Sequence, residues 1–290
     1  MAKSFAKITE SEEGTALVVD SLNLAFRWKH KGALFFLEEY VRTVESLAKS
    51  YKADTVIILS DWGSSSYRKE VYPEYKQNRK DKQAEQTPEE AAYFEKFFEE
   101  YLKIVEHFKA DPKYITLRFK NVEADDIAAH LVNNKDTYGF NKIWLISSDR
   151  DWDLLVQENV SRFSYVTRKE ITAENWNEHY EGSREDYISA KCLMGDPGDN
   201  VPGVFKIGPK TATKLIQQYG TALDIAASLP LPGKYVYIQN LNAFGADNIM
   251  RNYKLMDLVS FCDEAIGAEN IEEIKNELSL HKQRVCWGIW

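Results

Sequence analysis

The sequence has few cysteines and no long apolar segment. Its three cysteines, at positions 192, 262 and 286, are odd in number and far apart; this argues against a disulfide framework or a zinc motif and suits a reducing compartment. Unbroken apolar runs such as Val56–Leu59 and Ile143–Ile146 are only a few residues long, whereas a transmembrane helix needs about 20. The first residues, MAKSFAKITESEEG, also lack the apolar core of a secretory signal. We therefore expect a cytoplasmic protein with no membrane partner.

Acidic residues outnumber basic ones. The 290 residues include 45 Asp and Glu against 37 Lys and Arg, which gives a net charge of −8. Taken alone, this charge argues against a nucleic-acid partner, because such partners are held by Lys and Arg on phosphates. The composition, with 44% hydrophobic and 28% charged residues, is that of an ordinary globular chain, long enough to bury a core without metal or disulfide support.

Short apolar segments alternate with amphipathic ones in the first half of the chain. The predicted strands are Ala16–Asp20, Thr55–Asp61, Ile115–Phe119, Lys142–Ser147 and Val160–Val166. Apolar residues at helical spacing predict helices over 33–51 and 127–132, and Thr87-Pro88-Glu89-Glu90 is a typical start for another. This alternation predicts an α/β fold with a central, mostly parallel sheet flanked by helices. From about Ser183 the pattern is helical, and we expect one domain over residues 14–290 after a tail of residues 1–13.

Carboxylates gather at the ends of the predicted strands. The candidates are Asp20, Asp61, Glu123, Asp125, Asp126, Asp149, Asp151, Asp196 and Asp199. The carboxyl ends of parallel strands share one edge of a sheet, where ligands bind, and carboxylates crowded there raise one another's pKa unless a cation lies between them. Oxygen ligands without His or Cys favour Mg²⁺ or Mn²⁺. So many carboxylates indicate two such ions, an arrangement that hydrolyses phosphodiesters.

The same acids allow a plainer interpretation. A single Asp after a strand is more often a helix cap or turn residue than a metal ligand, and we interpret Asp153 as the cap of the short segment 152–156. The full set is harder to explain in this way. Without these nine acids the chain would have a net charge of +1 rather than −8, so its acidity is concentrated in the predicted site.

Two segments are basic. Residues 67–82, YRKEVYPEYKQNRKDK, hold six basic residues against three acidic ones, with three tyrosines between them. Residues 203–220 contain Lys206, Lys210 and Lys214, no acid, and a glycine turn that opens a helix at about Thr211. Backbone N–H groups and the helix dipole bind phosphate at such a turn, although a helix hairpin without a ligand has the same pattern.

Taken together, VVDSLN, ILSD, PEYKQNR, VEADD, ISSDRDWD and GDPGDNVPGVFKIGPKTA resemble the 5′-nuclease (flap endonuclease) family. This family includes the 5′-nuclease domains of bacterial DNA polymerase I and stand-alone phage enzymes, and LPLPGKYVYIQNLNA is most similar to phage enzymes of the T-five type. The resemblance implies a helical arch, here residues 62–110, and a helix-three-turn-helix that holds duplex DNA, here residues 184–232, often with K⁺. It also implies a 5′-3′ exonuclease and flap endonuclease that leaves 5′-phosphates, in the host cytoplasm if a phage encodes it.

The resemblance also assigns roles to residues. The nine acids would be ligands of two divalent cations, Mg²⁺ or Mn²⁺, directly or through water. Lys76 and Arg79, at the base of the arch, would be catalytic residues on the scissile phosphate, and bases could stack on Tyr72 or Tyr75 unless these rings simply pack in the core. The candidate DNA contacts are Arg68, Lys69, Tyr75, Lys80, Lys82, Lys191, Lys206, Lys210 and Lys214. The expected partner is branched or 5′-ended DNA, RNA in hybrids is a further candidate, and the protein is expected to be a monomer.

One position departs from the family pattern. The family has Gly-x-Gly-Ile-Gly in its turn, and Lys206 replaces the middle Gly. We expect a negative φ there, because a side chain at positive φ is strained. Two other functions are considered: a non-catalytic protein that binds branched DNA, and a metal-dependent phosphatase of small molecules. The first should have lost some acids, whereas all nine are present, and the second does not explain the basic segments.

Overall fold

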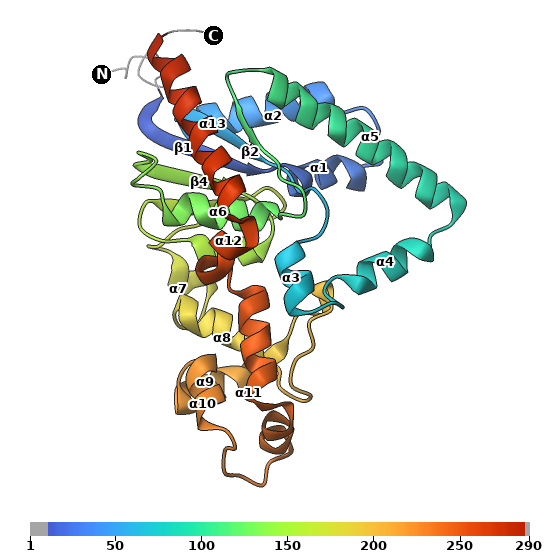
Figure 1. Cartoon of the computed structure of the whole chain (residues 1–290), viewed down its shortest axis with the longest axis vertical. Helices are drawn as coiled ribbons and strands as arrows, with labels where there is room; N and C mark the ends of the chain where they lie inside the picture. The colour runs from blue at the N-terminus through green and yellow to red at the C-terminus, as the bar shows by residue number, and fades with distance from the viewer. Residues whose placement is uncertain (1–10, 288–290) are drawn as a thin grey trace.

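A six-stranded sheet organises the N-terminal part of the molecule (Figure 1). The structure, a computed structural model, describes residues 11–287, so most of the predicted tail lies outside the described residues. The strands are β1 (Glu12–Asp20), β2 (Ala53–Leu59), β3 (Ile115–Leu117), β4 (Lys142–Ile146), β5 (Val160–Ser164) and β6 (Lys169–Ile171). Their order is β3-β2-β1-β4-β5-β6, and every pair is parallel except β5 with β6. The predicted α/β fold with a mostly parallel sheet is confirmed.

Helices surround the sheet and form the C-terminal part. Those up to residue 180 are α1 (Ser21–His30), α2 (Leu37–Ser50), α3 (Ser66–Val71), α4 (Gln77–Ala84), α5 (Pro88–Ala110), α6 (Ala124–Asn133), the 3₁₀ helix η2 (Arg150–Leu155) and α7 (Trp176–His179). The later ones are α8 (Arg184–Met194), the 3₁₀ helix η3 (Pro197–Asp199), α9 (Pro209–Tyr219), α10 (Ala222–Ser228), α11 (Val236–Met256), α12 (Leu258–Ile266) and α13 (Ala268–Trp287). The helical pattern predicted from about residue 183 is confirmed.

Both faces of the sheet are buried. On one face α1, α2 and α5 pack on a core that includes Leu17 and Ile58. On the other face α6, α12 and α13 pack on a core that includes Val18 and Ile57. Neighbouring residues of one strand enter different cores because successive side chains point to opposite faces. A sheet covered on both sides requires continuous apolar strands, which is why β1 contains the run ALVV.

Two helices, α4 and α5, extend away from the sheet and join at residues 85–87 (Figure 1). We call this pair the arch. The predicted start of α5 is confirmed: Thr87 Oγ1 accepts a hydrogen bond from the Glu90 amide at 3.2 Å, and the Glu90 carboxylate accepts one from the Thr87 amide at 2.9 Å. The later part of α5 is buried against the sheet through side chains such as Phe97 and Phe108, whereas α4 has no buried residue.

The C-terminal helices have an apolar cluster of their own. Side chains of α8, α9, α10 and α11, such as Cys192, Leu215, Ile225 and Leu241, pack together below the sheet in the view of Figure 1. The chain then returns, and α12 and α13 run back across the sheet. The single domain over residues 14–290 stays a prediction. So do the predicted bounds of the arch, 62–110, and of the helix-three-turn-helix region, 184–232. No helix within residues 11–287 is both long and apolar enough to cross a membrane.

Candidate active site

The strand order changes direction at the centre of the sheet. β1 has β2 on one side and β4 on the other, so the chain reverses its direction of winding between β1 and β4, and ligands bind at the carboxyl ends of strands at such a point. Asp20 ends β1, and Asp149 follows β4. Both are also helix caps, because Asp20 accepts from the Asn23 amide at 3.1 Å and Asp149 from the Asp151 amide at 2.9 Å. Asp20 and Asp149 therefore each cap a helix and also belong to the acids at the ends of the strands, which we call the acid cluster.

Two further acids are held beside them by defined hydrogen bonds. Asp61, just after β2, accepts from the Ala124 amide at 2.7 Å and so faces the start of α6. Asp125, in the first turn of α6, accepts from the Trp152 indole N–H at 2.6 Å. The charges of Asp149 and Asp61 act on Asp125, which places it with these acids.

Burial, followed by repulsion between neighbouring carboxylates, raises the pKa of three of these acids. Burial, then the charge of Asp61, raises the pKa of Asp20 to about 8. Burial and then Glu123 raise the pKa of Asp61, while burial, Asp149 and Asp61 raise that of Asp125 well above its ordinary value. Among residues 11–287, none of the ion pairs includes Asp20, Asp61, Asp125 or Asp149. We call these four residues the unpaired acids.

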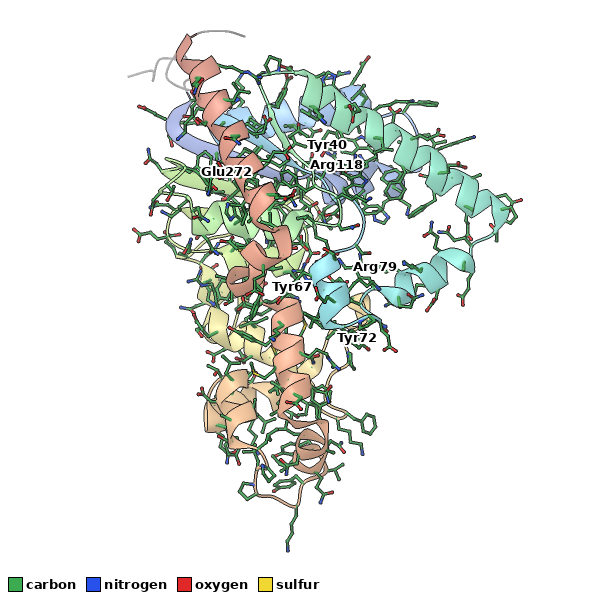
Figure 2. All side chains as sticks on the ribbon, viewed as in Figure 1. Tyr40, Tyr67, Tyr72, Arg79, Arg118 and Glu272 are labelled. Carbon is green, nitrogen blue, oxygen red and sulfur yellow. The ribbon has the colours of Figure 1, made fainter. Side chains whose placement is uncertain are left out.

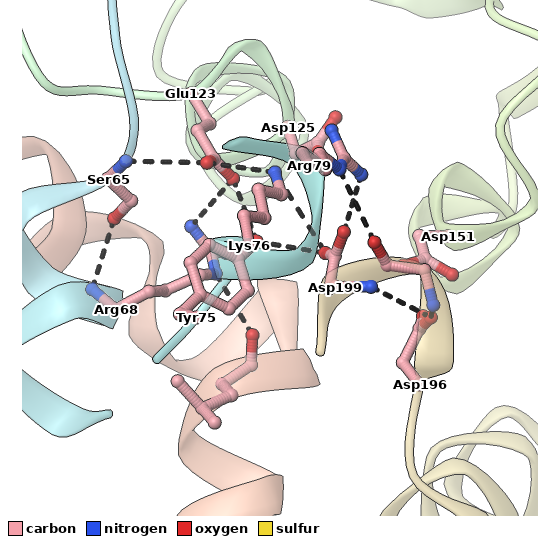
Figure 3. A network of polar contacts seen from close by, with 12 residues as sticks. Ser65, Arg68, Tyr75, Lys76, Arg79, Glu123, Asp125, Asp151, Asp196 and Asp199 are labelled. Atoms are coloured by element: carbon pink, nitrogen blue, oxygen red, sulfur yellow. Dashed lines mark hydrogen bonds and ion pairs between the residues drawn. The ribbon is translucent and has the colours of Figure 1, made fainter. Parts of the chain in front are cut away.

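The other acids are neutralised by cations from the protein. Glu123 accepts from the Lys76 ammonium at 2.9 Å and lies 3.5 Å from the Arg68 guanidinium. Burial alone would raise the pKa of Glu123, but these two cations lower it to about 2. Asp199 binds Arg79 at 2.5 Å and lies 3.9 Å from the Lys76 ammonium. Figure 3 shows Lys76 and Arg79 converging on Asp199, so the two predicted catalytic cations lie together at the acid cluster.

Lys191 neutralises two further acids, Asp151 and Asp196. Its ammonium binds the carboxylate of Asp151 and lies 3.4 Å from that of Asp196. Asp196 also accepts from the Gly198 amide at 2.8 Å, which fixes the short helix η3. Lys191 is only 9% exposed. Its predicted contact with DNA stays a prediction, but the structure gives it a place between two candidate metal ligands.

The donor set fits divalent cations of the Mg²⁺ class. Within the described residues, no three Asp, Glu, His or Cys side chains stand in the arrangement of a formed metal centre. The unpaired acids nevertheless offer only carboxylate oxygens, with no His or Cys, and such sets favour Mg²⁺ or Mn²⁺ over Zn²⁺. The pKa values of Asp20, Asp61 and Asp125 stay raised although the charge of Lys76 lowers those of Asp61 and Asp125, and a bound divalent ion would neutralise the remaining negative charge.

Two predicted site residues instead pair with each other. Arg68 was expected to steer DNA and Asp126 to bind metal, but the guanidinium of Arg68 makes two hydrogen bonds to the carboxylate of Asp126, at 2.6 and 2.7 Å. Arg68 is 3% exposed and Asp126 1%. The Arg68 Nε also donates to the Leu255 carbonyl at 2.9 Å. Arg68 therefore lies in the interior, where it ties α3, at the base of the arch, to α6 and α11. Its contact with DNA stays a prediction, and nothing in its present surroundings supports it.

Tyr75 also departs from its predicted role. The ring is 3% exposed and belongs to the C-terminal apolar cluster, so no base can stack on it in this structure. Its hydroxyl lies 3.1 Å from Glu123 and 3.0 Å from Asp199. Packing, the plainer interpretation of the tyrosines, holds here, with the addition that Tyr75 orients two acids. Tyr72 is partly buried, and its hydroxyl donates to Glu74 at 2.6 Å.

The remaining predicted DNA contacts are accessible to different degrees. Lys80, Lys82, Lys206, Lys210 and Lys214 are exposed. The Lys69 ammonium donates to the Pro73 carbonyl at 2.9 Å and is less available. Figure 2 places Arg79 where α4 begins, near Tyr72 and Tyr67 of the α3 region. These positions leave the basic residues of the arch and of α9 on the surface, where a phosphate can reach them.

Two predictions about local conformation are wrong. Lys206 has φ of +66°, not the negative value expected, so a lysine sits in the left-handed region that favours glycine. Asp153 does not cap a helix: it is fully buried, pairs with the guanidinium of Arg162 and accepts from the Tyr180 hydroxyl. The sequence DRDWD does not show that Asp153 is an interior acid, because its partner Arg162 lies on β5, outside this motif.

The chain is similar to proteins of known type along most of its length. Residues 15–181 match a family described as 5′-3′ exonuclease, N-terminal resolvase-like domain, and residues 183–278 match its C-terminal SAM fold. The flap endonuclease of Escherichia phage T5 is 45% identical over 276 residues, which cover 92% of this chain and 94% of that one. A thermostable DNA polymerase I of Thermus caldophilus is 32% identical over 75% of this chain, a match that spans 25% of the polymerase.

Solved structures give the same result. The crystal structure of the phage T5 protein co-crystallised with metal ions superposes with a TM-score of 0.86 at 42% identity and covers 92% of this chain and 99% of its own. A phage T5 flap endonuclease variant in a pseudo-enzyme-product complex with DNA and metal ions has the same TM-score and coverage. The resemblance inferred from the motifs is confirmed, as is the helix-three-turn-helix part of the fold.

Proposed function

The chain belongs to the 5′-3′ exonuclease family, and on that premise we propose that it is a metal-dependent flap endonuclease and 5′-3′ exonuclease of DNA. The observation that carries the proposal is the position of the unpaired acids Asp20, Asp61, Asp125 and Asp149 beside the cations Lys76 and Arg79. An acid cluster alone would suit many metal enzymes. Here the acids without an ion-pair partner can hold divalent cations, and the nearby Lys76 and Arg79 can bind a phosphate. This combination suits the hydrolysis of a phosphodiester.

The unpaired acids would hold the divalent cations, and the acids of the surrounding network would complete the ligand set directly or through water. The members of that network are Glu123, Asp151, Asp196 and Asp199. When bound, two such ions activate water and neutralise the charge that develops at a phosphodiester. Mg²⁺, with Mn²⁺ as a substitute, is the ion class that we propose, and K⁺ is proposed for the turn before α9. Asp126 is left out of the ligand set because Arg68 occupies both of its oxygens.

Lys76 and Arg79 would each leave a carboxylate and bind the substrate phosphate instead. In the structure Lys76 binds Glu123, and Arg79 binds Asp199. A divalent cation would attract the same carboxylates, which frees the two cations for the scissile phosphate. They then stabilise the negative charge on its oxygens in the transition state, an effect commonly worth 10²–10³-fold in rate for one well-placed donor. No histidine is required as a general base, and the cleaved strand keeps a 5′-phosphate.

The basic surface positions the substrate without reading its sequence. Lys80 and Lys82 on the arch would attract the single-stranded 5′ segment, and Lys210 and Lys214 on α9 would hold the phosphates of the duplex. Contacts to phosphates fix position and carry no sequence information, so cleavage should follow the shape of the DNA. The branched or 5′-ended substrate, cleavage of RNA in hybrids, a monomeric state and a place in the cytoplasm belong to this proposal.

Cleavage of a 5′-labelled 5′-flap duplex in Mg²⁺ tests the proposal, with the same duplex carrying a 3′ flap as the control. We expect cutting of the 5′ flap near the junction and none of the 3′ flap. Binding of the 5′ flap without cutting, in Mg²⁺ and in Mn²⁺, would favour the alternative of a non-catalytic protein that binds branched DNA. Equal cutting of both flaps would contradict the proposed polarity.

A further inference from the structure

An exposed tryptophan directly follows one of the unpaired acids. Trp62 is 47% exposed and comes immediately after Asp61, so the Cα atoms of the two residues are about 3.8 Å apart. Both belong to the β2–α3 loop, residues 60–65, which runs from the sheet to the base of the arch (Figure 1). Single exposed apolar side chains are common, but this one lies at the edge of the acid cluster, and the metal and phosphate contacts proposed above do not use it.

The loop holds the indole ring in a defined place. The Trp62 carbonyl accepts a hydrogen bond from the Asn121 amide at 2.6 Å, and the Asn121 carbonyl accepts one from the Ser66 amide at 3.0 Å. The guanidinium of Arg118 lies 4.9 Å from the centre of the Trp62 ring, and its Nε donates to the Asp61 carbonyl at 3.3 Å. Figure 2 shows Arg118 on the side of the molecule where this loop meets the sheet. A cation therefore braces the ring beside the acid cluster.

The ring is also part of the wall of a cavity. This cavity, of about 360 Å³, lies between α5, β3 and α13, and its volume is in the range of pockets that hold small ligands. Three basic and three acidic side chains line it: Lys109, Arg118, Arg284, Glu106, Glu273 and Glu277. Thr116 lines it as well, and its hydroxyl has no hydrogen-bond partner among residues 11–287.

The chemistry of this wall indicates a flat ligand without net charge. Balanced charges give a phosphate no advantage in the cavity, in contrast with the exposed Lys80 and Lys82 of the arch. The indole offers a large π-face, on which any nucleobase can stack, and the charged groups and the Thr116 hydroxyl can bond the donors and acceptors on the edge of a base. Only an unpaired base offers such a face, because in a duplex both faces of a base are covered by its neighbours.

The place of the ring indicates which strand reaches it. The charge of Lys76 acts on Asp61, whereas Lys191 lies 3.4 Å from Asp196, so these two acids stand in different parts of the cluster. η3 and α9 follow Asp196 in the chain, which puts the proposed duplex contacts on that side. The single-stranded 5′ segment, on the other side of the scissile phosphate, would meet Asp61 and Trp62 where the β2–α3 loop leads into the arch.

We propose that the cavity beside Trp62 binds one unpaired nucleobase of the 5′ segment, close to the scissile phosphodiester, with the base stacked on the Trp62 ring. This inference rests on the proposed function and deepens it, because the proposed contacts of the arch are to phosphates and this one is to a base. Every base has a π-face, so the contact tolerates any sequence, but it requires that a base be present. The site holds the strand that is removed, not the strand that is kept.

Binding of 5′-flap DNA in EDTA, measured by fluorescence anisotropy, tests the inference on flaps with an abasic residue at each of the first few unpaired positions in turn. Trp62→Ala should weaken binding of the intact flap roughly tenfold, the loss expected for one base–aromatic stack. At one position the abasic flap should bind the wild type as weakly, and there Trp62→Ala should cause no further loss. Trp62→Phe keeps an aromatic face and should bind the intact flap within about threefold of wild type. Val259→Ala, at a side chain that is 39% exposed on α12 and outside the cavity, is the control and should bind as the wild type does.

A fluorescent base analogue provides a second readout that does not depend on affinity. 2-Aminopurine at the same position of the flap loses fluorescence when it stacks, so the wild type should quench it and Trp62→Ala should not. Equal binding of the intact flap by Trp62→Ala and wild type, or an equal loss on the intact flap and on every abasic flap, would overturn the inference. Failure of the wild-type chain to bind any 5′ flap would instead overturn the proposed function.

Discussion

The buried acid Asp20 makes folding without metal depend on pH. Its pKa is about 8 in the folded chain, against an ordinary value of 3.8, chiefly because of burial and next because of the charge of Asp61. The folded chain therefore holds the Asp20 proton more tightly than the unfolded chain does. Asp20 contributes stability that is fully present below pH 4 and is lost as the pH rises toward 8.

The size of this loss follows from the shift. About four pKa units separate the folded and unfolded values, and each unit is worth about 1.4 kcal/mol, so the full effect is on the order of 5 kcal/mol. Roughly 4 kcal/mol of it falls between pH 5 and pH 8. Burial also raises the pKa values of Asp61 and Asp125, so they act in the same direction, whereas the lowered pKa of Glu123 acts in the opposite one.

Urea unfolding in EDTA at pH 5 and pH 8 isolates the contribution of Asp20. Asp20→Asn removes the titration but keeps a good cap for α1, since Asn caps helices as well as Asp does. We expect the stability of this variant to fall by several kcal/mol less than that of the wild type over this range. Asp136→Asn, at a carboxylate that is 87% exposed, is the control and should behave as the wild type. Identical pH dependence of Asp20→Asn and wild type would refute the reasoning.

Three further predictions follow from the site. Arg68→Ala leaves the carboxylate of Asp126 buried without its partner and should lower the free energy of unfolding by about 3–5 kcal/mol, whereas Lys69→Ala, on the surface beside it, should change it by less than about 0.5 kcal/mol in the same urea titration. Mg²⁺ or Mn²⁺ at 100 times its Kd should add about 2.7 kcal/mol of stability, so thermal melts that are unchanged on going from EDTA to Mg²⁺ would count against a metal site at the unpaired acids. Lys210→Ala should weaken DNA binding equally for all sequences and reduce the slope of log K against log salt by about 1; a slope equal to the wild-type slope would remove Lys210 from the duplex contact.

The sheet was predictable because its strands are buried on both faces. Runs such as ALVV in β1 and VIIL in β2 are short and rich in β-branched residues, which favours buried strands over helices. The first strand extends further back than predicted, to Glu12, and α1 and β6 were not predicted at all. α1 has no start signal apart from Asp20, which we interpreted only as a site residue. β6 is a three-residue antiparallel edge strand, too short to give a periodic pattern.

The candidate site was predictable as a set of acids and only in part as a geometry. Spacing along the chain shows which carboxylates follow strands, but the pairing of Arg68 with Asp126 joins residues 58 positions apart in sequence. The same holds for Lys191 with Asp151, which lie 40 positions apart. A basic residue beside tyrosines looks like a DNA contact in sequence, and only packing decides whether its guanidinium faces solvent or an interior carboxylate.

Single-turnover cleavage of a 5′ flap in Mg²⁺ by two variants tests the central claim most directly. Asp149 belongs to the unpaired acids and lies at the surface, whereas Asp126 is bound by Arg68 in the interior. Asp149→Asn should bind the flap but cut it at least about 10²-fold more slowly than wild type, and Asp126→Asn should still cut at a temperature at which it is folded. Unchanged cutting by Asp149→Asn, or an equal loss in both variants, would contradict the assignment of the unpaired acids as the metal site.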